Sequence, residues 1–224
     1  MKLAALFSGG KDSVYAMHIA KKNHDVSCLI TIKSKNKESY MFHTPNINLT
    51  ELQAESIGLP LLTIETKGEK EKELTDLKNG IKKAKELFDI EGVVTGAISS
   101  VYQAARIQKI CAELDLWCFN PLWQKDQLEL LNELLNEKFK VMLSGVFAYP
   151  FSEGWLGRIL DQNALLELKE MKEKYKINPA GEGGEFESLV LNCPSFSKEI
   201  KVKKAEKKYS NYSGIYDVKE AVLE

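Results

Sequence analysis

The stretch KLAALFSGGKDS, residues 2–13, decides the fold. A short apolar run ends in two glycines, and residues 12–23 then read as a helix; a buried parallel strand that runs directly into a helix has this pattern. Adjacent glycines let the backbone turn sharply and present bare N–H groups. The start of the helix adds unpaired donors and a partial positive charge. The stretch therefore predicts a strand–loop–helix unit that binds phosphate.

The residues that follow keep alternating between strand and helix. Apolar runs predict further strands, and the segments between these runs predict further helices. The first of these further helices is expected to be capped by Asn46 or Asn48 and to end at Gly58. Such alternation predicts a Rossmann-like α/β domain, with a parallel sheet and helices on both faces. The expected strands are 26–33, 60–65, 92–96, 116–119 and 139–147, and the expected helices end at 58, 88, 114 and 137.

The pattern changes near residue 148. A turn region rich in Gly, Trp and Arg is followed by a helix over 161–175 and strand-like pieces at 185–191, 198–208 and 214–218. We therefore expect a nucleotide-binding domain over residues 1–147 and a smaller α+β domain over residues 148–224.

Composition excludes several classes of protein. The 224 residues carry 31 Lys and Arg against 32 Asp and Glu, so no global field draws the chain to nucleic acid or a membrane. The apolar runs are far shorter than the roughly 20 residues that span a bilayer, and the N-terminus lacks the layout of a signal peptide. We expect a cytoplasmic protein. Six lysines in residues 198–209 fit either a patch for an acidic partner or RNA, or an edge strand protected from aggregation, and the edge strand is favoured.

The loop residues suit a nucleotide. Ser8 and Ser13 can donate from their hydroxyls, Lys11 can pair with phosphate or point to solvent, and Asp12 can hold the Mg²⁺ that accompanies ATP. The alternative is a tight turn in which Asp12 and Ser13 only cap the helix. Neither Gly-x4-Gly-Lys-Ser/Thr nor a strand followed by Gly-x-Gly-x-x-Gly occurs, so the other common phosphate loops do not fit.

The motif SGGKDS resembles the signature of the PP-loop, or N-type, ATP pyrophosphatases. ESYMFH at 38–43, Gly96-Ala97-Ile98, PLW at 121–123 and GEGGEFE at 181–187 resemble the diphthine–ammonia ligase family along the whole chain, as in archaeal-type members with only the ligase part. The resemblance implies ATP-dependent amidation of diphthine on elongation factor 2, giving diphthamide, AMP and pyrophosphate. The loop, including Gly9 and Gly10, would hold pyrophosphate. With no glutaminase-like domain and no cysteine at residue 2, ammonium is the expected nitrogen source, and a homodimer is left open.

Other candidates follow from geometry, because ligands bind at the carboxyl ends of parallel strands. Thr31 and Ile32 are expected to meet adenine through backbone groups. Gly96 either lets backbone approach the nucleotide or simply forms a turn, and Gly145 follows the late strand. His43 is either structural or part of a loop near the nucleotide.

Two more sets of residues are candidates. Tyr102, Gln103 and Arg106 start a helix whose face meets either the substrate or solvent. Glu182, Glu185 and Glu187 surround glycines, and if 185–191 is a strand, Glu185 and Glu187 share a face. From the residues alone they suit either a turn with a solvated edge or the binding and deprotonation of ammonium, and the family resemblance favours the second.

Two rival functions remain. A PP-loop protein that thiolates tRNA would carry paired cysteines or a basic RNA-binding module, whereas Cys28, Cys111, Cys118 and Cys193 form no Cys-x-x-Cys pair and read as small apolar residues. Amidation of a small molecule is a related alternative. A nucleotide-binding protein without chemistry would lack the aspartate of the loop, and Asp12 is present.

Overall fold

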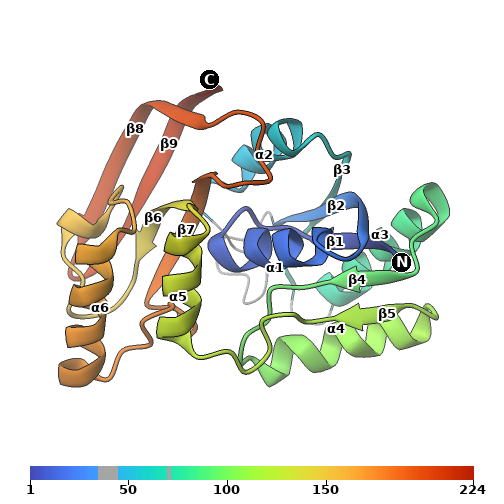
Figure 1. Cartoon of the computed structure of the whole chain (residues 1–224), viewed down its shortest axis with the longest axis horizontal. Helices are drawn as coiled ribbons and strands as arrows, with labels where there is room; N and C mark the ends of the chain where they lie inside the picture. The colour runs from blue at the N-terminus through green and yellow to red at the C-terminus, as the bar shows by residue number, and fades with distance from the viewer. Residues whose placement is uncertain (35–44, 70–71) are drawn as a thin grey trace.

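The computed structural model describes residues 1–34, 45–69 and 72–224. Its first layer is a parallel sheet in the order β3-β2-β1-β4-β5 (Figure 1). Every neighbouring pair in it is parallel, which confirms the predicted Rossmann-like α/β class. The strands are β1 Lys2–Leu6, β2 Asp25–Ser34, β3 Leu61–Thr66, β4 Gly92–Val94 and β5 Trp117–Phe119.

Four helices cover this sheet: α1 Lys11–Lys21, α2 Thr50–Ile57, α3 Lys72–Phe88 and α4 Val101–Glu113. Alternate residues of β1 enter different apolar clusters. Leu3 and Ala5 pack with residues of α1 and α2, whereas Ala4 packs with residues of α3 and α4. Since successive strand residues point to opposite faces, the helices lie on both faces, as predicted.

The second layer is an antiparallel sheet in the order β7-β6-β9-β8. It contains β6 Lys140–Val146, β7 Phe186–Asn192, β8 Ile200–Ser210 and β9 Ser213–Leu223. Two helices accompany it, α5 Gln127–Asn136 and α6 Gln162–Tyr175, and a short 3₁₀ turn, η2, covers Glu153–Trp155. The lysine-rich strand β8 lies at the sheet edge, as predicted.

The placement of β6 corrects one expectation. The strand expected at 139–147 was assigned to the parallel sheet, but residues 140–146 pair antiparallel with β7 and β9. β6 lies between two partners and is buried along six of its seven residues. A central strand that is covered on both faces is as continuously apolar as a parallel strand, so its sequence does not reveal its sheet. The boundary between residues 147 and 148 stays a prediction, and it separates β6 from its partner β7.

The expected helix cap at Asn46 or Asn48 is also wrong. The 3₁₀ turn η1, Ile47–Leu49, leads directly into α2, and neither residue caps a helix with its side chain. The backbone of Asn46 is in the left-handed conformation, with φ 62°. Its side-chain amide makes two hydrogen bonds with the backbone of β9: Nδ2 donates to the Tyr216 carbonyl at 2.9 Å, and Oδ1 accepts from Val218 N at 2.8 Å. The predicted end of α2 at Gly58 is confirmed.

One apolar cluster joins the two layers, with residues from β1, α1, α5, β6, α6 and β7. The β7 backbone also reaches the loop after β1, since Val190 N donates to the Gly9 carbonyl at 3.0 Å. The C-terminal sheet therefore supplies one wall of the region where the parallel strands end. Within the described residues, every helix is too short or too polar to cross a lipid bilayer.

Candidate active site

The predicted phosphate loop lies between β1 and α1 and borders a cavity of about 530 Å³. The cavity is lined by the loop, the ends of β2 and β4, the start of α4, residues 181–184 before β7 and residues 186–188 within it. This is the size of a small-molecule site, and it lies at the carboxyl ends of the parallel strands, as predicted. The contribution of β7 agrees with the family resemblance of residues 181–187, which made Glu187 a candidate.

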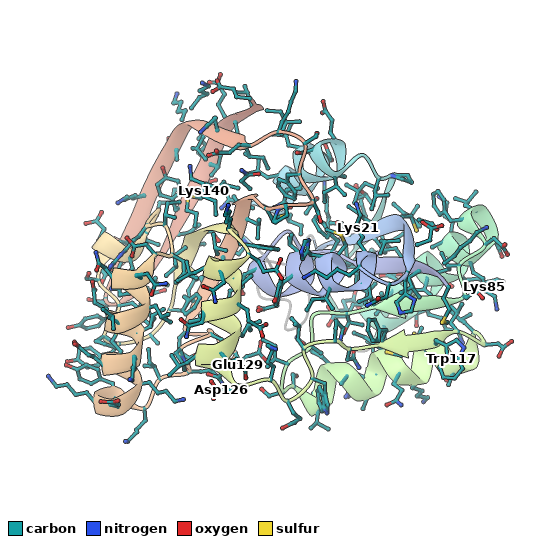
Figure 2. All side chains as sticks on the ribbon, viewed as in Figure 1. Lys21, Lys85, Trp117, Asp126, Glu129 and Lys140 are labelled. Carbon is teal, nitrogen blue, oxygen red and sulfur yellow. The ribbon has the colours of Figure 1, made fainter. Side chains whose placement is uncertain are left out.

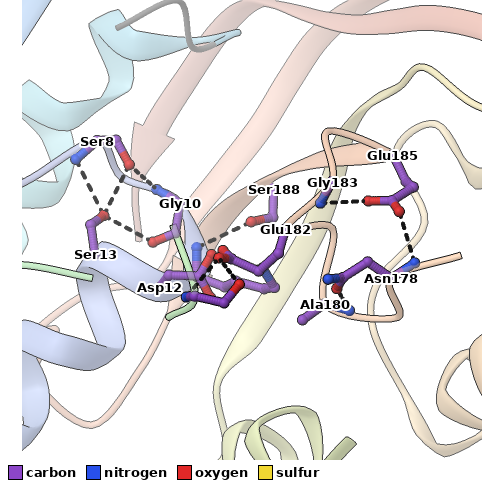
Figure 3. Close-up of polar contacts among 12 residues, drawn as sticks. Ser8, Gly10, Asp12, Ser13, Asn178, Ala180, Glu182, Gly183, Glu185 and Ser188 are labelled. Carbon is purple, nitrogen blue, oxygen red and sulfur yellow. Dashed lines mark hydrogen bonds and ion pairs between the residues drawn. The ribbon is translucent and has the colours of Figure 1, made fainter. Parts of the chain in front are cut away.

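Three backbone N–H groups of the loop donate hydrogen bonds to serine hydroxyls. Ser8 N donates to Ser13 Oγ at 3.2 Å, Gly10 N to Ser8 Oγ at 3.4 Å and Lys11 N to Ser188 Oγ at 3.1 Å (Figure 3). A hydroxyl can rotate and change between accepting and donating. The loop can therefore release these N–H groups to phosphate oxygens without leaving them unpaired. Ser188 was missed by sequence analysis, since it is one of many serines and lies in another sheet.

The shape of the loop depends on Gly9 and on a buried glutamine. Gly9 has φ +79°, and a Cβ there would lie 2.3 Å from Gln53 Oε1. Gln53 is fully buried, and its Nε2 donates to the Gly9 carbonyl at 3.0 Å and to the Val190 carbonyl at 2.8 Å. Gln53 therefore ties the loop to β7. Sequence analysis missed it, although an amide beside Ala54 on a helix with a buried side was a usable signal.

Lys11 and Asp12 form an ion pair inside the site. Lys11 is 3% exposed, and its Nζ lies 2.8 Å from Asp12 Oδ2 and 5.4 Å from the centre of the Phe186 ring. The lysine thus does not point to solvent. Asp12 Oδ1 is buried and has no hydrogen-bond partner in the described structure. A buried carboxylate oxygen without a partner is costly, and a cation would satisfy it.

Two of the three predicted glutamates face the same cavity. Glu182 Oε2 accepts from Ser99 N and Ser99 Oγ, both at 3.3 Å, and Figure 3 shows Glu182 beside Asp12. Burial, with the nearby charge of Asp12, raises the pKa of the Glu182 carboxyl. Burial likewise raises the pKa of Glu187 to about 7, because the charge of Lys11 only partly offsets the loss of water.

Glu185 does not join them, so the expectation that it shares a face with Glu187 is wrong. The strand begins only at Phe186, and Glu185 turns away from the cavity (Figure 3). Its carboxylate accepts from Asn178 N at 2.7 Å and from Gly183 N at 2.9 Å. Glu185 therefore holds the shape of the turn that carries Glu182.

Of the residues expected to contact the nucleotide, some line the cavity and others do not. Ile32 lines the cavity, but Thr31 does not: its Oγ1 donates to the Phe7 carbonyl at 2.6 Å and ties β2 to the end of β1. Gly96 lines the cavity, and a Cβ there would lie 2.7 Å from the Asp12 carbonyl carbon. Gly96 is thus needed for close packing against the start of α1. Gly145 lies within β6, outside the parallel sheet, and pairs with Glu187.

The three candidates at the start of α4 also have different surroundings. Gln103 lines the cavity, whereas the Arg106 guanidinium stacks 3.4 Å from the centre of the Tyr102 ring. Arg106 Nη1 also donates to the Tyr102 carbonyl at 3.4 Å. His43 and the aromatic cluster around it lie outside the described residues.

The fold and the loop define the class: a parallel α/β nucleotide-binding protein of the PP-loop type, which uses ATP. Models of the diphthamide synthase N-terminal and C-terminal domains match residues 1–117 and 126–223. The Homo sapiens protein named diphthine–ammonia ligase is 35% identical over 92% of this chain and 84% of its own length. The Danio rerio protein of that name is 35% identical over 89% and 86%. The chain belongs to the diphthamide synthase family.

A solved structure gives a weaker likeness. It is described as a predicted subunit of tRNA methyltransferase from Methanocaldococcus jannaschii, and it aligns with a TM-score of 0.43 at 18% identity, over 87% of this chain and 98% of that one.

Proposed function

We propose that this chain amidates the carboxylate of diphthine on elongation factor 2, using ATP and ammonium and releasing AMP and pyrophosphate. One observation carries the proposal: a single cavity contains the phosphate loop and two carboxyls, Glu182 and Glu187, whose pKa values are raised. Ligation with ammonia needs both parts, because the acid must be activated and ammonium must lose a proton.

The loop suits ATP accompanied by Mg²⁺. Mg²⁺ is usually held by one or two carboxylates together with substrate phosphates. Asp12, with its unpartnered Oδ1, fits that role, and in the described ranges no group of three or more His, Cys, Asp or Glu side chains forms a protein-only metal site. When bound, the ion would neutralise phosphate charge during adenylation. Lys11 and the freed N–H groups of the loop would hold the departing pyrophosphate.

Glu187 is the proposed proton acceptor. A base works best when its pKa lies near the working pH, and burial brings Glu187 to about 7. Glu182, beside Asp12 and also in the cavity, adds negative charge that attracts ammonium. Glu185 supports the turn without facing the cavity, which moves the proton-transfer role expected of the three glutamates to Glu187 and Glu182.

The test uses ¹⁵N-ammonium, ATP and elongation factor 2 carrying diphthine. We expect one amide nitrogen incorporated for each AMP and pyrophosphate released, and no incorporation into unmodified elongation factor 2. Release of ADP and phosphate, or equal labelling of both forms of the factor, would contradict the proposal.

The rival reading as a tRNA thiolase has less support. None of the four cysteines lines the cavity, and Cys111 and Cys118 lie in the apolar cluster under α3 and α4. The assay above also distinguishes the proposed reaction from the amidation of a smaller carboxylate at the same site. A cytoplasmic location follows from the proposed substrate, and a homodimer stays a prediction.

A further inference from the structure

A second hollow adjoins the active-site cavity. It is a groove of about 400 Å³ at the start of α5 and the end of α6, two helices that pack against each other (Figure 1). Ile98 and Ser99 line the groove, while Ala97 and Ser100 line the cavity. The turn at 178–185 is divided likewise, with Gly181–Gly184 on the cavity and Asn178 and Glu185 on the groove. The two hollows therefore share a wall.

Three lysines line the groove, and two of them form no ion pair with the described part of the fold. The three are Lys125, Lys172 and Lys176. Lys125 pairs with Glu133 at 2.8 Å, but neither Lys172 nor Lys176 forms an ion pair within residues 1–34, 45–69 and 72–224. Lys208 and Lys219 of the β8–β9 hairpin, in contrast, pair with carboxylates of the same hairpin. Lys172 and Lys176 are thus available to an external anion.

The acidic residues of the groove do not cancel this charge by direct pairing. Asp126 caps α5, accepting from Leu128 N at 2.9 Å and Glu129 N at 3.0 Å, and Figure 2 labels Asp126 and Glu129 at this end of the helix. Glu185 accepts two backbone N–H groups of its own turn. Next to Asp126, Gln127 has a buried Oε1 without a partner in the described structure. The groove therefore offers two free ammonium groups and one unused acceptor.

Exposed aromatic rings continue this surface. Tyr149 stacks edge-on against Tyr175 and Tyr212, with ring centres 5.1 and 4.9 Å apart. Tyr149 is 54% exposed and Tyr212 47% exposed. Tyr175 is the last residue of α6 and Lys176 follows it, so the tyrosine cluster and the groove lie at the same end of this helix. Tyrosine is one of the residues enriched at the centres of protein interfaces.

We propose that the groove and the tyrosine cluster form the docking surface for the protein substrate and bind an acidic segment next to the residue that enters the cavity. The identity of that protein rests on the proposed function. The shared wall places the docked segment beside the turn that carries Glu182. The two free lysines select acidic chemistry, and the rings supply apolar contact area.

The test compares two double variants with the same change in charge. Lys172→Glu/Lys176→Asn removes the free charges of the groove. Lys83→Glu/Lys138→Asn is the control: Lys83 and Lys138 are exposed and line neither hollow, and Lys138, like Lys176, has φ 60°. We expect the groove variant to raise KM for elongation factor 2 on the order of tenfold at low salt, with kcat and ATP affinity unchanged. The control should keep the wild-type KM.

Aromatic variants test the other half of the surface. Tyr212→Asn should also raise KM for elongation factor 2, whereas Trp117→Ser should not, since Trp117 is exposed on β5 at the opposite end of the molecule from α6 (Figure 2). An unchanged KM in the groove variant, or an equal rise in its control, overturns the docking proposal.

A binding assay separates this proposal from the function. A fluorescent polyglutamate peptide should bind wild type and the control variant, and should lose most of its affinity for the groove variant. If wild type amidates nothing but this pattern holds, the proposed function fails, whereas the proposal of a groove that binds acidic segments stands. Equal peptide binding by all three proteins overturns the groove. The proposal is also overturned if wild type binds an RNA of equal charge more tightly than the peptide and the groove variant loses that RNA binding.

Discussion

Gln53→Met isolates the contact between the phosphate loop and the C-terminal sheet. The substitution nearly preserves volume but removes both amide donors, which serve the Gly9 and Val190 carbonyls at 3.0 and 2.8 Å. Gly9 keeps its bond from Val190 N, so the main loss falls on one buried acceptor. The cost of such a loss is about 1–3 kcal/mol.

For a chain of this size, each kcal/mol lowers Tm by roughly 2–4 °C, so we expect a fall of roughly 2–12 °C by calorimetry. The freed loop should also bind ATP more weakly, with KM for ATP raised on the order of tenfold, because its donors are no longer held in place. Gln108→Met is the matched control, since Gln108 is exposed on α4 and lines neither hollow. An unchanged Tm and KM for ATP, or equal effects in the control, would refute the reasoning.

Three further predictions concern residues of the site. Asp12→Asn should lower AMP formation at least about a hundredfold, as expected for a lost electrostatic partner of the metal, while Tm stays within a few degrees; retained turnover at saturating Mg²⁺ would make Asp12 only a partner of Lys11. Gly96→Ala should weaken ATP binding measured by calorimetric titration, because its Cβ would meet the Asp12 backbone at 2.7 Å; wild-type affinity would show that α1 can shift without cost. Glu185→Gln should lower Tm by a few degrees, since its carboxylate accepts two backbone N–H groups; loss of amidation at a normal Tm, restored by high ammonium, would return Glu185 to the chemistry.

Most of the parallel sheet could be predicted from the sequence, because each strand is a short apolar run and a helix separates it from the next strand. The loop after β1 was equally clear, since two adjacent glycines and a helix start specify both shape and chemistry. β6 was placed in the wrong sheet because burial on both faces gives the same apolar run in a parallel strand and in a central antiparallel one.

The site was harder to predict wherever it depends on contacts between distant segments. Gln53, Ser188 and Val190 reach the loop from α2 and β7. A local pattern can indicate that an amide such as Gln53 is buried, but it does not indicate which distant atom that amide bonds. The sequence indicated that the three glutamates around the glycines are candidates for the site, but it did not indicate the direction in which each side chain points. The strand starts one residue later than expected, and the period-two argument fails for a residue outside the strand. Thr31 was expected to meet adenine through backbone groups, yet only its neighbour Ile32 lines the cavity.

The central claim is that Glu187, held near neutral pKa beside the phosphate loop, takes the proton from ammonium. Folding raises its pKa from 4.5 to about 7. The stability that its protonated form supports is therefore lost as pH rises from about 4.5 through 7, while the deprotonated base needed for amidation appears over the upper part of the same range.

The direct measurement is ¹⁵N-ammonium incorporation into diphthine-bearing elongation factor 2 from pH 5.5 to 8.5, at a constant concentration of the ammonium ion, for wild type and Glu187→Gln. Wild-type incorporation should rise through a step near pH 7. The Gln variant should lose that step and most of its rate while still binding ATP. A Gln variant with the wild-type rate and the same step would contradict the account.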